Sequence, residues 1–110
     1  MVKNTDFDTL SALKFDNRFI DELAADPDQE NIRRQVFSSC YSFVDSAPAS
    51  APTLVAFSRE VAELVGLTEQ DCQSDLFKQV FTGNTVLEGM QAHAQCYGGH
   101  QFGNWAGQLG

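Results

Sequence analysis

The sequence predicts an α+β fold in which short helices are followed by extended segments. Residues 58–66 begin with Ser58 and end at Gly66, residues 75–82 are preceded by Ser74 and followed by Gly83, and both carry apolar residues at helical spacing, which is the pattern of a capped helix. Residues 35–44 hold valine and aromatic residues, and 93–109 hold aromatic, small and polar residues, in both cases without that periodicity, so we expect both segments to be extended. A chain of 110 residues is long enough for one domain.

The composition excludes several classes of function. Seven basic and 15 acidic residues give a net charge of −8, and no basic run is present that would bind nucleic acid. No apolar run approaches the ~20 residues of a membrane span, and the N-terminus shows no signal or transit pattern. Three widely spaced cysteines fit a reducing compartment. We therefore expect a cytoplasmic protein that binds neither nucleic acid nor membrane.

Residues 1–31 form an acidic segment in which we expect helical turns at 6–13 and 17–24. The carboxylates of this segment carry no metal or acid–base pattern, so we interpret them as a solvated acidic face. The pair Arg33 and Arg34 is assigned to surface ion pairs. The acidic residues concerned are Asp6, Asp8, Asp26, Asp28 and Glu30.

Residues 32–89 are predicted to be a helical and extended region, interrupted by a loop at 45–52, "DSAPASAP". Ser58 is the expected N-cap of the first helix and Gly66 its stop. The apolar face of that helix is predicted to comprise Val61, Leu64 and Val65.

The second helix of this region is predicted to begin after Ser74 and to end at Gly83. Its apolar residues are Leu76, Phe77, Val80 and Phe81. Thr68, followed three residues later by Asp71, predicts a capped turn between the two helices.

The final segment, residues 90–110, has no formal charge, and its closing stretch, "YGGHQFGNWAGQLG" (97–110), is rich in glycine. Glycine lets the main chain approach a phosphate closely. Gly98 and Gly103 have the spacing of a Walker A loop, but Asn104 and Trp105 replace the required Lys and Ser/Thr, and no G-x-G is present. By residue pattern alone, a structural turn is favoured over a ligand-binding loop.

The same segment contains other residues that carry chemistry. His93, Cys96 and His100 have a spacing that a zinc site or a Cys96–His100 nucleophile pair would use, but a structural zinc needs four ligands. We favour a buried cysteine beside hydrogen-bonded histidines. Phe102 and Trp105 are expected in the core, with stacking on a nucleobase as the alternative.

The closing stretch, 97–110, resembles the signature of the selenoprotein O family. The resemblance extends upstream through "FDNRFIDEL" (15–23), "YSFV" (41–44), "PTLVAFSREVAELVGL" (52–67) and "FTGN" (81–84). The chain departs from the family pattern at Ala24, at 44–48 and at Ala92–His93, all outside the glycine-rich loop.

The resemblance implies the N-terminal part of a protein-kinase-like fold that binds ATP with Mg²⁺ or Mn²⁺. Members transfer AMP to Ser, Thr or Tyr hydroxyls of protein substrates. Gln108, Leu109 and Gly110 match the opening half of the nucleotide-binding loop. The role of the preceding signature is open; it comprises Tyr97, Gly98, Gly99, His100, Gln101, Phe102 and Gly103.

We expect the chain to be an N-terminal fragment of a longer enzyme, without catalytic or metal-binding residues, bound cofactor or activity of its own. Exposed apolar surface is expected to favour self-association. The alternative is a non-catalytic interaction or scaffold module in which the amphipathic helices face a partner.

Overall fold

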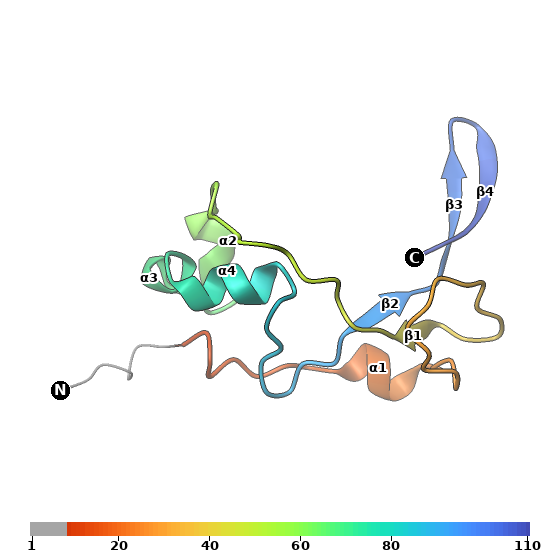
Figure 1. The fold of residues 1–110 in the computed structure, drawn as a ribbon, viewed down its shortest axis with the longest axis horizontal. Coiled ribbons are helices and arrows are strands. Elements are labelled where there is room, and N and C mark those ends of the chain that lie inside the picture. The colour runs from red at the N-terminus through yellow and green to blue at the C-terminus, as the bar shows by residue number, and fades with distance from the viewer. Residues whose placement is uncertain (1–8) are drawn as a thin grey trace. The chain divides into compact units, whose positions relative to one another are not determined.

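The structure, a computed structural model, describes residues 9–110 and confirms the α+β class (Figure 1). Short helices are accompanied by two small antiparallel sheets, in which β1 pairs with β2 and β3 with β4. The elements are α1 (Arg18–Glu22), β1 (Tyr41–Phe43), α2 (Arg59–Leu64), α3 (Glu69–Cys72), α4 (Asp75–Phe81), β2 (His93–Gln95), β3 (Tyr97–Gln101) and β4 (Asn104–Leu109).

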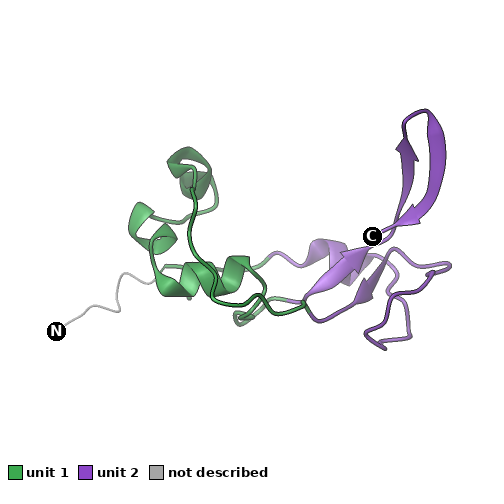
Figure 2. Cartoon of the chain, turned by 45° about the horizontal axis from the view of Figure 1, so that its top comes forward, with its two compact units in different colours: residues 1–15, 46–90 green, residues 16–45, 91–110 purple. Residues whose placement is uncertain are grey.

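The chain divides into two compact units, each built from two separate stretches of sequence (Figure 2). Unit 1 comprises residues 1–15 and 46–90, of which 1–8 lie outside the described part, and it contains α2, α3 and α4. Unit 2 comprises residues 16–45 and 91–110 and contains α1 and all four strands. The expected turn at 6–13 is present over residues 9–12; residue 13 lies outside the turn, and residues 6–8 lie outside the described part of the chain.

The predicted caps of the unit 1 helices are confirmed. The Ser58 hydroxyl accepts a hydrogen bond from the Val61 amide at 3.2 Å, and Ser74 caps α4 in the same way. Thr68 and Asp71 form a reciprocal capping box at the start of α3. Gly66 has φ +82°, the left-handed conformation that ends a helix. Among the described residues no helix is long and apolar enough to cross a membrane.

The core of unit 1 differs from the predicted apolar face of α2. Leu10, Ala62, Leu67 and Cys72 form the buried cluster. Val61, Leu64 and Val65, the predicted apolar face of α2, are 57%, 83% and 54% exposed, so this face does not contribute to that core. The six-residue helix thus buries its small residue, Ala62, in one cluster with Leu10 from the N-terminal stretch.

Unit 2 is centred on Tyr41, whose side chain is 2% exposed. Its ring contacts those of Phe19, Phe43 and His93, with centroids 5.3–5.7 Å apart, and its hydroxyl donates to the carbonyl of Ile20 in α1 at 2.5 Å. The strand predicted over 35–44 is shorter than expected. Only Tyr41–Phe43 pairs with β2, in the register Tyr41↔Gln95 to Phe43↔His93.

Candidate functional site

The glycine-rich signature forms an antiparallel hairpin of β3 and β4 in unit 2 (Figure 1). Phe102 and Gly103 make its two-residue turn, with φ of +50° and +80°, the signs that a type I′ turn requires at both positions. The expectation that Phe102 and Trp105 lie in the core is wrong, since they are 100% and 70% exposed. A two-stranded hairpin has little interior: in this one only Gly99 is buried.

Two adjacent glycines of β3 leave room for side chains that cross the hairpin. A Cβ placed on Gly98 would overlap the indole ring of Trp105. A Cβ on Gly99 would overlap the Leu109 side chain, including its branch carbon. These two glycines therefore serve packing within the hairpin.

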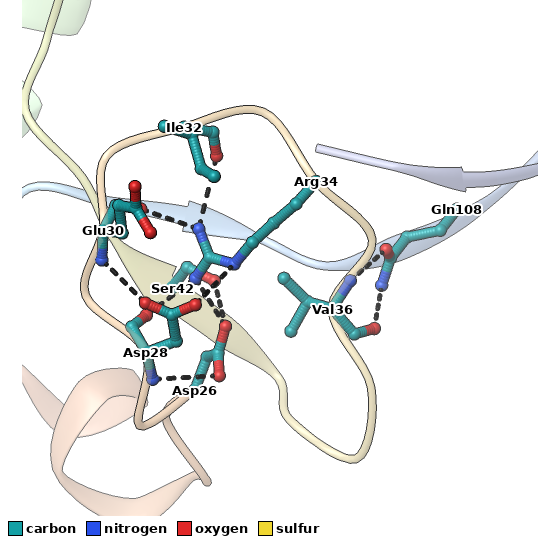
Figure 3. Close-up of polar contacts among 8 residues, drawn as sticks. All are labelled: Asp26, Asp28, Glu30, Ile32, Arg34, Val36, Ser42 and Gln108. Atoms are coloured by element: carbon teal, nitrogen blue, oxygen red, sulfur yellow. Dashed lines mark hydrogen bonds and ion pairs between the residues drawn. The ribbon is translucent and has the colours of Figure 1, made fainter.

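Among the residues predicted to bind nucleotide, Gln108 and Leu109 use their side chains within the protein, and Gly110 has none. The Gln108 amide accepts a hydrogen bond from the Val36 N–H at 2.8 Å and donates one to the Val36 carbonyl at 2.7 Å (Figure 3). Leu109 packs on Gly99, and Gly110, at φ +94°, lies where a Cβ would overlap the Gln95 carbonyl. What this stretch offers to a ligand is therefore its main chain.

Gly107, just before Gln108, pairs with Gly99 of β3 and has free space on its Cβ side. Gly107 has φ +83°, and a Cβ built on it would meet no atom within 4 Å. A left-handed φ favours glycine over other residues, and the space beside Gly107 is unobstructed.

A loop organised around Arg34 lies beside the end of β4 (Figure 3). The guanidinium donates to the Asp26 carboxylate at 2.6 Å, to the Asp28 carbonyl at 2.7 Å and to the Glu30 carbonyl at 2.8 Å. The Arg34 and Asp26 side chains are only 17% and 13% exposed. A single cation thus gathers the acceptors of residues 26–30 into a compact turn.

The pKa shifts of Asp26 and Arg34 agree with their short ion pair. The hydrogen bond from Arg34 is the main cause that holds the pKa of Asp26 below its usual 3.8, and the same bond raises the pKa of Arg34. The prediction of a solvated acidic face is wrong for Asp26, because its carboxylate is the partner of a largely buried cation. The sequence signal for this turn is the alternation of acids at 26, 28 and 30. The N–H of each later residue bonds the carboxylate two residues earlier.

A cavity of about 260 Å³ adjoins this arrangement within unit 2. Arg34 and Val36 line it from the loop, Ser42 from β1, and Gln108 and Gly110 from the end of the chain. The loop and the end of β4 therefore share a space large enough for a small group.

The residues considered for zinc or nucleophilic chemistry contact different partners. The His93 ring stacks on Phe19 and its Nδ1 lies 2.9 Å from the Gln91 carbonyl, while the Cys96 amide donates to the Cys40 carbonyl. Over residues 9–110, no three His, Cys, Asp or Glu side chains are grouped so that they could hold a metal ion. We therefore assign no metal ligand to the described residues.

Comparison with known proteins gives the family. A family model described as "Protein adenylyltransferase SelO" matches residues 26–110. The chain belongs to the SelO family. This confirms the resemblance to the selenoprotein O family, and the match begins at Asp26, the ion-pair partner of Arg34, and includes the whole hairpin.

Relatives of this SelO chain carry the name protein nucleotidyltransferase YdiU. The chain is 57% identical to the protein from Azoarcus sp. and 55% identical to that from Aromatoleum aromaticum, in each case over 98 residues, which are 89% of this chain and 19% of the relative. The protein from Rhodopirellula baltica is 52% identical over 98 residues, 89% of this chain and 18% of the relative. The chain thus spans about a fifth of the length of these relatives.

Proposed function

We propose that this chain supplies the opening half of the nucleotide-binding loop of a protein adenylyltransferase with a protein-kinase-like fold. The main chain at Gln108, Leu109 and Gly110 would bind phosphate oxygens of ATP through N–H groups, as glycine-rich loops do. Membership of the SelO family and the cavity that Gln108 and Gly110 line with Arg34 support this assignment. The single observation that carries it is the match of the family model through the last residue of the hairpin segment.

The reaction of the complete enzyme would be transfer of AMP to a Ser, Thr or Tyr hydroxyl of a protein substrate. The hydroxyl oxygen attacks the α-phosphorus of ATP and the bond from that phosphorus to the β-phosphate oxygen breaks. Pyrophosphate leaves and the hydroxyl proton is released. Mg²⁺ or Mn²⁺, when bound, would neutralise phosphate charge.

We further propose that the 110-residue chain alone does not catalyse this transfer. Its candidate contribution is main-chain binding of phosphate, and binding that is equal in the ground and transition states does not accelerate the chemical step. Among the described residues we assign no general base and no metal ligand.

A chimera tests the proposed function. The 98-residue matching segment of the Azoarcus relative is replaced by the corresponding segment of this chain, and the product is incubated with ATP, Mg²⁺ and a protein acceptor. Label placed on the α-phosphate should be transferred to protein, whereas label on the γ-phosphate should be released in pyrophosphate. The isolated chain is the control and should transfer neither. Transfer of γ-label, or of no label while the unmodified relative is active, contradicts the proposal.

An apolar groove in unit 1 favours the alternative, a non-catalytic interaction module. Its volume is about 270 Å³, and it is lined from α2 by Val61 and Val65 and from α4 by Phe77 and Phe81. The same chimera separates the two functions. AMP transfer that survives the charged substitution Val61→Asp assigns the chain to the enzyme, whereas an inactive chimera that still binds a partner through this groove favours the interaction module.

A further inference from the structure

Gln108 joins β4 to a residue 72 positions earlier in the sequence. Its amide oxygen and nitrogen bond both main-chain groups of Val36, at 2.8 and 2.7 Å, so the side chain takes the place that a paired strand would occupy (Figure 3). Both polar ends of the amide are used, which fixes its orientation. Gln108 is half-buried and is followed directly by the last two residues of the proposed nucleotide-binding stretch.

Val36 is itself held by a series of contacts that begins in the sheet of unit 2. The Asp26 N–H donates to the Tyr41 carbonyl at 2.8 Å, which ties the start of the loop to β1. The Asp26 carboxylate binds the Arg34 guanidinium, and Arg34 precedes Val36 by two residues. The partner of Gln108 is therefore a loop fixed at several points.

We infer that Gln108 is a positioning residue, which sets the place of the nucleotide-binding main chain at Leu109 and Gly110 by holding β4 against Val36. This inference rests on the proposed function and sharpens it, because the side chain of Gln108 then acts on Val36 and not on the nucleotide. Removal of the Gln108 side chain leaves the proposed phosphate-binding N–H groups of Leu109 and Gly110 in the chain but no longer fixes their position. Loss of two hydrogen bonds predicts a weakening of ATP binding of about tenfold.

The first experiment measures amide hydrogen exchange at Val36 in the nucleotide-free chain. The variant Gln108→Ala should speed exchange at Val36 about tenfold or more, because its N–H loses the acceptor. Gln108→Glu retains an acceptor for that N–H, so it should preserve much of the protection. The matched control is Gln35→Ala, which truncates an exposed glutamine next to Val36. Unchanged Val36 exchange in Gln108→Ala overturns the inference.

The second experiment measures AMP transfer by the chimera with the same variants. Gln108→Ala should raise the KM for ATP about tenfold with a smaller effect on kcat, and Gln108→Glu should recover part of the loss. Faster Val36 exchange with an unchanged KM for ATP would mean that the contact is only structural, and this overturns the positioning role. Gln108→Ala that raises KM without altering Val36 exchange would place Gln108 on the nucleotide instead, which also overturns it.

Val36 hydrogen exchange and AMP transfer by the chimera distinguish failure of this inference from failure of the proposed function. Hydrogen exchange without nucleotide reports the contact with Val36 whether or not AMP is transferred. A chimera without transfer activity contradicts the proposed function and removes the positioning role with it, while the exchange result still establishes or refutes the contact.

Discussion

Gly98 and Gly99 are adjacent, yet replacing each with alanine should have different consequences. Neither has a positive φ, so alanine is compatible with the backbone at both positions, and the gain from a less flexible unfolded chain is about 0.4–1 kcal/mol in each case. The difference must therefore come from the side chain that each new methyl group meets.

At Gly98 the obstacle is the outer edge of the Trp105 indole, and that side chain is 70% exposed. The indole can swing into solvent, which forfeits one cross-strand contact worth roughly 0.2–1 kcal/mol. The lost contact energy nearly equals the stability gained because alanine makes the unfolded chain less flexible. Gly98→Ala should therefore change hairpin stability by no more than about 0.5 kcal/mol.

At Gly99 the obstacle is Leu109, and the glycine is buried. The overlap includes the branch carbon of Leu109, so rotation of one methyl group does not relieve it. Overpacking of this kind costs about 1–3 kcal/mol. After the unfolded-state gain, Gly99→Ala should destabilise the hairpin by about 1–2 kcal/mol.

Native-state hydrogen exchange of the β3 and β4 amides measures both effects, and fluorescence of Trp105, the only tryptophan, reports the indole. Gly98→Ala should shift the emission with little change in exchange, whereas Gly99→Ala should speed exchange with a smaller emission shift. Gln101→Ala, an exposed substitution on β3, is the control. Equal losses at the two glycines, or a larger loss at Gly98, would refute the reasoning.

Three further predictions concern unit 1, and each is tested by measuring the free energy of unfolding by urea denaturation. Leu10→Ala, at a fully buried site, should lower the free energy of unfolding by about 2–5 kcal/mol, whereas Leu64→Ala, at a site 83% exposed, should change it by less than about 0.5 kcal/mol. Thr68→Ala removes the capping box and should cost about 1 kcal/mol, against no loss for the exposed Thr53→Ala. Burial alone would raise the pKa of Asp71, but hydrogen bonds from Thr9 and Thr68 outweigh it and hold the pKa below 3.8. The stability from Asp71 is therefore present above about pH 4 and lost as pH falls through the folded-state pKa, and Asp71→Asn should flatten this dependence.

Local features of the fold were predictable because their causes are local. Ser58 and Ser74 cap helices whose first N–H groups lie within three residues, and Gly66 ends a helix through its own φ. Burial was not predictable from the same stretch. Periodicity indicates an apolar face on α2, but the residue of α2 that is buried is Ala62, in a cluster with Leu10, which lies far before it in the sequence.

In the candidate site too, local features were predictable from the sequence and contacts between distant residues were not. The extended character of 93–109 and the turn within it follow from glycine and β-forming residues. The contact of Gln108 with Val36 has no sequence signature, because an amide that bonds a main chain can pair with any residue. The loop around Arg34 was missed because a run of acids is usually solvated, and only the packing of the loop makes Asp26 an internal partner.

The glycines of the hairpin serve separate purposes, and this limits where a nucleotide can act. Gly98 and Gly99 make room for Trp105 and Leu109, and Gly103 supplies the turn, so structural needs explain all three. Gly107 is likewise explained by its left-handed φ of +83°, and Gln108, which follows it, has its side chain committed to Val36. The proposed phosphate binding therefore depends on the main chain of residues 108–110, and a loss of ATP binding on Gly99→Ala should be traceable to hairpin opening and not to a lost ligand contact.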